Sequence, residues 1–178
     1  MNNTTTDTSP LPADDLLRSS VIARPETNEG LRHVSVVGDT YTILLDGGQT
    51  DNHYCLIDML IPQNGGPPPH RHDFEETFIV LEGEIVATFR GQTSTVKTGE
   101  TLHIPANAPH RFTNARPEPA RLLCICSPAG QEEFFLTIGD LVPTRTSTPP
   151  EMDEADRKAR MEKALSLVFR YRTEILTP

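Results

Sequence analysis

The chain has 178 residues and a formal net charge of −9 at pH 7. Its length predicts one domain that can bury a sizeable core, and its acidic balance argues against a nucleic-acid partner, which would require a basic surface. No apolar stretch approaches the roughly 20 residues that cross a bilayer, and the N-terminus lacks a basic start and an apolar core, so we expect a cytoplasmic protein without membrane association.

The first 30 residues are predicted to form an arm that is mobile in part, since residues 1–15 are rich in Thr, Asn, Asp and Pro. From residue 31 onward, short runs of strand-forming residues alternate with turn signals at Gly38, Gly83 and Gly91. Many short strands at close spacing predict an all-β barrel over residues 31–142. The runs are HVSVV, TYTILL, HYCLIDMLI, ETFIVLEG, EIVATFR, STVKT, TLHIP, HRFTN and ARLLCICS.

His70, His72 and Glu76 follow a turn at residues 64–69 that is rich in Gly and Pro. Residues separated by an even number project from the same face of a strand, so these three side chains would point together into a barrel. The alternative is a polar surface loop whose histidines and acids face water. His110 from a neighbouring strand would complete a set of three imidazoles and one carboxylate, which suits a divalent transition metal.

At these residues the chain resembles the cupin superfamily, and specifically the small single-domain cupin 2 or quercetin-dioxygenase-like proteins. The first cupin motif has the spacing of His70, His72, Glu76 and Gly83. The second motif has the spacing of Gly99, Pro105, His110 and Asn114. The resemblance spans roughly residues 52–128.

Asn64 and Asn107 stand where the two motifs have glycine. Asn is the residue other than glycine that best tolerates positive φ in a tight turn, so both departures are compatible with the fold. The resemblance implies a double-stranded β-helix, which is a jelly-roll barrel, and it implies a homodimer. It also implies one divalent transition metal per chain; the sequence does not choose among Fe, Mn, Ni, Cu and Zn.

In the dioxygenases that the chain resembles, a metal holds an oxygen of the substrate beside dioxygen, and a glutamate assists by taking a proton. Glu76 would be that catalytic residue, and Glu75 would replace it as ligand if a bulge exchanged their facing. Inward parity gives Phe78, Val80 and Phe112 as candidate residues of the substrate pocket. The alternative for each is ordinary filling of a small barrel.

Three further histidines lack partners at ligand spacing and are predicted to be structural or at the surface: His33, His53 and His103. The three cysteines lie in apolar runs, so we expect buried free thiols rather than disulfides. A role as metal ligand stays open for Cys124 and Cys126.

Two helices are predicted after the barrel. A short one covers Gln131–Gly139, where Phe134 and Phe135 would either shape a pocket or fill the core. Residues 143–178 contain a linker and a longer helix from Glu151 to about Leu176, a stretch without Gly or Pro. Its apolar stripe would pack on the outside of its own barrel or, alternatively, across a dimer partner.

Three functions are consistent with this reading. The leading hypothesis is a metal-dependent oxidoreductase of the dioxygenase type that acts on a small, oxygen-rich or aromatic compound. The second is a metal-dependent lyase or isomerase that uses the ion as a Lewis acid. The third is a non-enzymatic metallo-cupin that binds a small ligand. Each of the three hypotheses predicts a small molecule as partner. Fold analogy supports the dioxygenase hypothesis.

Overall fold

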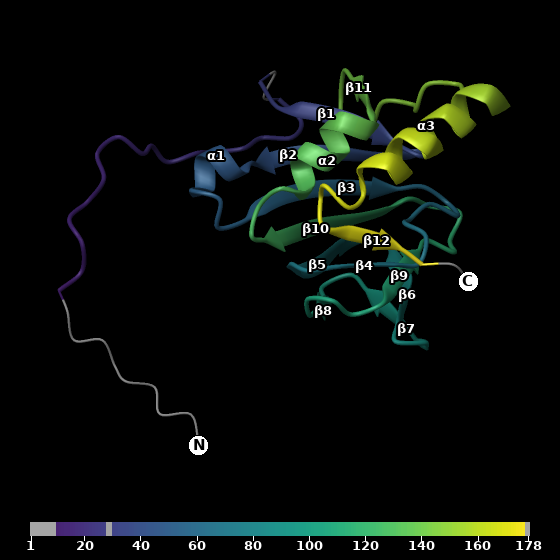
Figure 1. The fold of residues 1–178 in the computed structure, drawn as a ribbon, viewed down its shortest axis with the longest axis horizontal. Helices are drawn as coiled ribbons and strands as arrows, with labels where there is room; N and C mark the ends of the chain where they lie inside the picture. Colours follow the sequence, from purple (N-terminus) through teal and green to yellow (C-terminus); the bar gives the residue numbers. More distant parts are fainter. Residues whose placement is uncertain (1–9, 28–29, 177–178) are drawn as a thin grey trace.

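The computed structural model describes residues 10–27 and 30–176, and two antiparallel sheets form its centre (Figure 1). The order in the larger sheet is β11 (Asp140–Val142), β1 (Arg32–Val36), β2 (Asp39–Leu45), β3 (Cys55–Ile61), β10 (Ala120–Ser127), β5 (Glu75–Glu82) and β8 (Thr101–Ile104). The order in the smaller sheet is β12 (Thr173–Ile175), β4 (His70–His72), β9 (His110–Thr113), β6 (Glu84–Phe89) and β7 (Gln92–Lys97). This is the predicted all-β jelly-roll barrel.

The core lies between the two sheets because their strands alternate buried and exposed side chains. Phe78 on β5 meets Phe112 on β9 edge to face, with ring centroids 5.1 Å apart. Both rings are almost fully buried, as are Leu122 on β10 and Ile85 on β6. The nine predicted β runs each contain one strand, β1–β3 and β5–β10, so the period-two pattern predicted these strands correctly.

The chain changes sheets between His72 and Glu75, which corrects the expectation of one continuous strand through the His and Glu cluster. His72 ends β4 in the smaller sheet, and Glu75 begins β5 in the larger sheet. Asp73 and Phe74 form the bend between them. His70 and His72 therefore point inward from one strand and Glu76 from another, and these two strands face each other across the barrel.

The long C-terminal helix is shorter than predicted. The helix α3 covers Glu154–Leu167, and Thr173–Ile175 form β12 beside β4 rather than a continuation of the helix. Arg172 has a positive φ of 57°, which ends any helical path, and the backbone then pairs Thr173 with His72. The free edge of β4 thus decides the conformation of a segment whose residues favour a helix.

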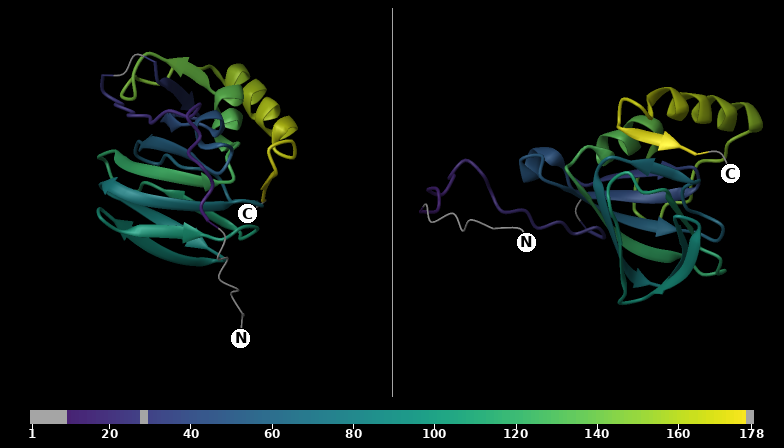
Figure 2. Two further views of the ribbon diagram at one scale, coloured as in Figure 1. Left: turned by 90° about the vertical axis from the view of Figure 1, so that its left-hand side faces the viewer. Right: turned by 60° about the horizontal axis from the view of Figure 1, so that its bottom comes forward.

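The short helix α2 covers Gln131–Ile138, close to its predicted range. The helix α3 packs against α2 of its own chain, and both lie over the β1–β3 side of the larger sheet (Figures 1 and 2). A third, single-turn helix, α1, covers Gly47–Thr50. Residues 10–27 are mostly exposed and run away from the barrel, while residues 1–9 of the predicted arm lie outside the described residues. In the described residues, no helix is long and apolar enough to cross a membrane.

Candidate metal centre

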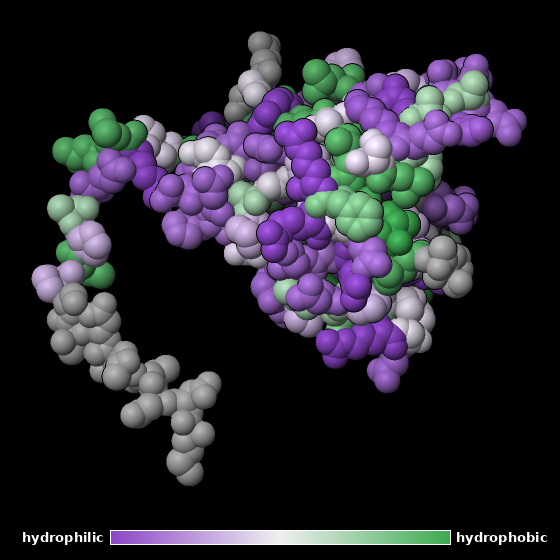
Figure 3. Space-filling model, in the orientation of Figure 1, coloured by the Kyte–Doolittle hydropathy of each residue, from purple (hydrophilic) through white to green (hydrophobic). Residues whose placement is uncertain are grey.

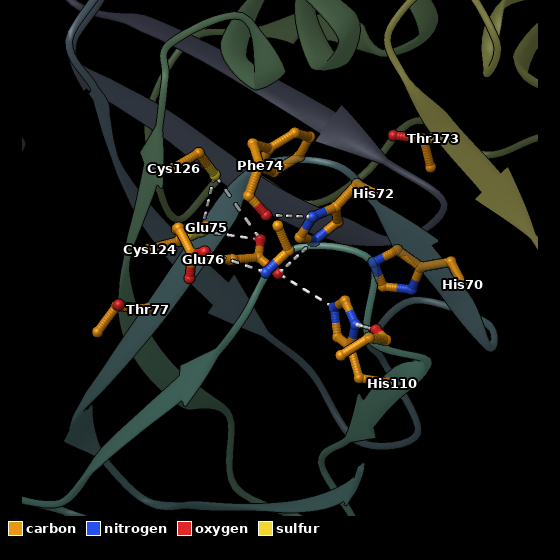
Figure 4. A network of polar contacts seen from close by, with 12 residues as sticks. His70, His72, Phe74, Glu75, Glu76, Thr77, His110, Cys124, Cys126 and Thr173 are labelled. Carbon is orange, nitrogen blue, oxygen red and sulfur yellow. Dashed lines mark hydrogen bonds and ion pairs between the residues drawn. The ribbon is translucent and has the colours of Figure 1, made fainter. Parts of the chain in front are cut away.

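The four predicted ligands come together inside the barrel (Figure 4). His70 and His72 lie on β4, and His110 on β9 pairs directly with His70 in the smaller sheet. Glu76, the second residue of β5, faces them from the larger sheet. All four side chains are buried, and their candidate ligand atoms lie within 4.8 Å of one another.

The backbone fixes the tautomer of all three imidazoles. In each ring Nδ1 lies 2.9 Å from a carbonyl oxygen. The carbonyls belong to Pro68 for His70, Phe74 for His72 and Ala108 for His110. A carbonyl can only accept a hydrogen bond, so Nδ1 carries the hydrogen, and Nε2 of each neutral ring presents its lone pair.

The Glu76 carboxylate meets those lone pairs. Its Oε2 lies 3.1 Å from Nε2 of His72 and 3.1 Å from Nε2 of His110. Burial raises the pKa of Glu76, whereas hydrogen bonds from protonated Nε2 atoms of His110 and His72 would lower that pKa below its usual range. Two acceptors at this distance require a proton or a cation between them, and a divalent metal satisfies all of the lone pairs at once.

His70 faces the cavity and is neutral at physiological pH. Burial, with the nearby His110 ring adding to it, lowers the pKa of His70 to about 4. A neutral imidazole is the form that binds a metal, so no proton has to be displaced from this ring at pH 7. The ring of His72 is held in place by stacking on Phe74, with centroids 3.7 Å apart.

Two thiols hold the other oxygen of Glu76. The Sγ of Cys124 donates to Oε1 at 3.2 Å, and the Sγ of Cys126 lies 3.7 Å from the same atom. Burial raises the pKa of Cys124 to about 12, which keeps this thiol protonated and able to donate. The three cysteines are free and buried, as predicted. Glu76, Cys124 and Cys126 also form a second group whose atoms are close enough to hold a metal.

The remaining candidates lie outside the four-residue cluster. Glu75 points to the other face of β5, where its half-exposed carboxylate lies 3.0 Å from Nε2 of His103. His33 is buried and contacts the Thr42 hydroxyl at 2.8 Å, while His53 contacts the backbone of its own loop. No bulge exchanges Glu75 with Glu76, so the geometry favours Glu76 as the ligand.

A mostly apolar cavity adjoins the cluster, with His70 and Glu76 in its wall. Phe78 and Phe112 of the predicted pocket line it, and Phe134 and Phe135 of α2 line it as well. Val80 is also buried but is not part of the cavity wall.

Sequence reasoning missed several other residues of the cavity wall: Asp39, Tyr41, Gln131, Val168 and Thr173. Asp39 follows a glycine and reads as part of a turn, and Thr173 lies in a segment that reads as helix. Neither therefore carried a signal for a site.

A two-sheet antiparallel barrel with three buried histidines and one glutamate facing inward defines a class of small β-barrel proteins with a candidate metal centre. Residues 57–126, which include all four cluster residues, match the family described as Cupin domain (Cupin_2). The match therefore identifies residues 57–126 as a cupin domain.

Two relatives are similar in sequence. Quercetin 2,3-dioxygenase of Bacillus subtilis is 29% identical over 117 residues, which cover 65% of this chain and 34% of that protein. An uncharacterized protein of Methanocaldococcus jannaschii is 30% identical over 79 residues, which cover 44% of this chain and 63% of that protein. The matched part is thus less than two thirds of the length of either relative.

Two solved structures share the fold. An RmlC-like cupin from Shewanella frigidimarina has a TM-score of 0.51 at 15% identity and covers 62% of this chain and 96% of that chain. A predicted oxalate decarboxylase from Thermotoga maritima has a TM-score of 0.53 at 18% identity and covers 61% of this chain and 99% of that chain. At these identities the likeness concerns the fold alone.

Proposed function

We propose that the chain is a metal-dependent cupin of the dioxygenase type, acting on a small oxygen-rich or aromatic compound. One divalent transition metal per chain would be held by His70, His72, Glu76 and His110. One observation supports the metal. Nε2 of His72 and Nε2 of His110 both turn a lone pair toward the same carboxylate oxygen of Glu76. That arrangement is unfavourable without a cation or an added proton.

Such a metal would supply a Lewis acid and, if redox-active, a route for electrons between substrate and dioxygen. The protein supplies the rest. The apolar wall excludes water, and the rings of Phe78 and Phe112, which pack edge to face on each other, make its inner part aromatic. Glu76 is ionised at neutral pH and can accept a proton from a substrate hydroxyl, although its low pKa makes it a weak base.

The oxidoreductase assignment is supported by the similarity to the Bacillus quercetin 2,3-dioxygenase and by the aromatic cavity beside the cluster. The test is elemental analysis of protein purified without added metal, paired with oxygen uptake on a panel of flavonols, catechols and diketones. We expect Fe, Mn, Ni or Cu near one per chain and oxygen consumption. Zinc, or no uptake with any metal restored, would favour a lyase, an isomerase or a ligand-binding cupin instead.

We also propose a homodimer. Large apolar side chains are exposed at the end of α3 and on β12, among them Leu165 at 45%, Phe169 at 80% and Ile175 at 36%. Figure 3 shows apolar surface gathered near α2, the end of α3 and β12. Contiguous exposed apolar surface commonly marks an interface. Light scattering after size exclusion tests this directly, and a mass of one chain at micromolar concentration would contradict it.

A further inference from the structure

The cavity beside the metal centre opens to the surface as an apolar groove. Val37 between β1 and β2, Leu165 in α3 and Ile175 in β12 all line the cavity, yet each side chain is exposed, that of Val37 at 78%. These three residues therefore form the rim of the groove. Phe169, just beyond the end of α3, is exposed as well, and Figure 3 shows the apolar surface gathered around this part of the molecule.

The N-terminal arm, residues 10–27, carries apolar side chains that remain exposed to solvent. Leu17 is 94% exposed, and the segment between residues 11 and 22 holds five large apolar residues of this kind: Leu11, Leu16, Leu17, Val21 and Ile22. Single exposed apolar residues are ordinary on a protein surface, but five in so short a segment are not. The composition of the arm is therefore that of a segment that packs on an apolar surface.

The arm leaves its own barrel at the end opposite the groove. Arg18 donates a hydrogen bond of 3.3 Å to the carbonyl oxygen of Gln49 in α1, and Glu26 forms an ion pair with Arg145. Figures 1 and 2 show the arm and α1 at one end of the molecule and α3 at the other. These anchors hold the arm away from the groove of its own chain, so a second copy is the better source of an occupant.

The charges of the two surfaces favour this contact. The chain is acidic overall, but residues 157–172, which include most of α3, contain six Arg or Lys residues and one acidic residue. Residues 10–17 of the arm contain two acidic residues and no basic residue. Opposite charges steer two surfaces together and fix their orientation, while apolar contacts supply most of the affinity. Two chains with a net charge of −9 therefore meet with least repulsion where the arm of one faces α3 of the other.

We propose that the arm of one chain docks in the groove of a second copy. Twofold symmetry repeats the contact, so the two chains exchange their arms. Leu16 and Leu17 of one chain would cover Leu165 on the rim of the other, and each cavity, with His70 and Glu76 in its wall, would be closed by a segment of the partner. The proposal rests on the proposed homodimer, for which it identifies the interface.

The first test compares the dissociation constant of the dimer between two arm variants by analytical ultracentrifugation. Leu16→Asp combined with Leu17→Asp should weaken the dimer at least about a hundredfold, because two apolar contacts are replaced by carboxylates. Ser19→Asp combined with Ser20→Asp is the matched control. It adds the same charge to the same exposed arm but removes no apolar side chain, so it should weaken the dimer less than about threefold. Both variants leave the barrel unchanged.

A second test asks which chain provides the arm in the groove. The double variant Leu17→Cys and Leu165→Cys is oxidised, and its mass is measured under denaturing conditions without a reductant. An exchanged arm should give a covalent dimer, whereas an arm that folds back on its own chain would give a monomer with an internal disulfide. Leu17→Cys combined with Thr93→Cys, on the exposed strand β7, is the control and should form the covalent dimer at least about tenfold more slowly.

Three results would overturn the proposal, and they separate it from the rest of the proposed function. A wild-type mass of one chain at micromolar concentration would contradict both the arm exchange and the homodimer. A Leu16 and Leu17 variant that dimerises as tightly as the serine control would leave the homodimer but place its interface elsewhere. An internal disulfide would assign the groove to the arm of the same chain. Because neither metal nor turnover is measured, all three results are independent of the dioxygenase assignment.

Discussion

Two polar regions line the same cavity, and they are built in opposite ways. In the metal centre, each imidazole is anchored through Nδ1 to a backbone carbonyl, and Glu76 is held by two rings and two thiols. Where α2 covers the barrel, Asp39 Oδ1 and Gln131 Oε1 are buried without a comparable set of side-chain partners. The first region is organised around its carboxylate, whereas the second buries polar atoms at a cost in stability.

The difference follows from where each region sits in the fold. The cluster residues come from β4, β5 and β9, whose backbones are fixed by pairing within the two sheets. Asp39 begins β2, and Gln131 begins α2, so both lie where the helix layer covers the barrel. Paired strands hold the cluster side chains in fixed positions, whereas side chains between the helix layer and the barrel are positioned less closely.

Removal of one imidazole of the cluster should cause the largest loss of metal affinity. We expect His110→Ala to lower metal affinity by at least about a thousandfold, or about 4 kcal/mol, since it removes a direct ligand and the partner of Glu76. Metal content after dialysis measures this. His103→Ala, on the outer face of β8, should retain full metal content, and stoichiometric metal in the His110 variant would contradict the centre.

In the second region, Asp39→Asn should instead stabilise the protein at high pH. The pKa of Asp39, about 7 when folded against an ordinary 3.8, means that the fold favours the protonated form. Ionisation therefore costs stability progressively between about pH 4 and pH 7, up to about 4 kcal/mol above pH 7. Urea unfolding of the metal-free protein should show the variant equal to wild type near pH 4 and more stable at pH 8.

This substitution removes one carboxyl group, so an exposed aspartate provides the matched control. Asp14→Asn should change the stability at neither pH, because its side chain lies on the exposed arm. An Asp39 variant that is less stable than wild type at pH 8 would show that the carboxylate is structural.

The two regions also differ in how far the sequence could predict them. The four cluster residues lie at a motif spacing, and the structure brings them together, although their binding of a metal stays a prediction. Asn64 and Asn107, which replace motif glycines, have φ angles of 64° and 66°, in the left-handed region that was inferred for them. Local rules were sufficient there because each turn is set by its own residues.

The second region could not be predicted because nothing local marks it. Asp39 and Gln131 are 92 positions apart and become neighbours of one cavity only through packing of α2 on the barrel. The strand β12 was not predicted for a similar reason, since pairing of Thr173 with His72 overrides the helix preference of the tail. The short strands β4 and β11 also exist only through pairing with distant segments.

Truncation of the apolar wall that joins the two regions should have a smaller effect. Val168 is 4% exposed and lines the cavity, so Val168→Ala should cost about 1–2 kcal/mol in the free energy of unfolding. Met161 also lines the cavity but is 48% exposed, and Met161→Ala should cost less than about 0.5 kcal/mol. Similar losses for both would mean that the end of α3 does not close the cavity.

The thiols next to Glu76 should have the smallest effect on metal affinity, and their variants test whether they orient the Glu76 carboxylate. Cys124→Ala removes the donor at 3.2 Å from Oε1, which frees the carboxylate to rotate away from the imidazoles. We expect about a tenfold loss of metal affinity, the usual scale for a partner that orients a ligand. Cys55→Ala is the matched control, because Cys55 is equally buried but does not hydrogen-bond to Glu76.

Both cysteine variants create a similar small void and should lose similar stability, so only the difference in metal affinity reports on the orientation of Glu76. A separate result would follow if Cys124 and Cys126 bound a second ion through Oε1, since loss of Cys124 would then lower the number of metals per chain rather than the affinity of one. Equal metal affinity in the two variants would show that the imidazoles alone fix the carboxylate.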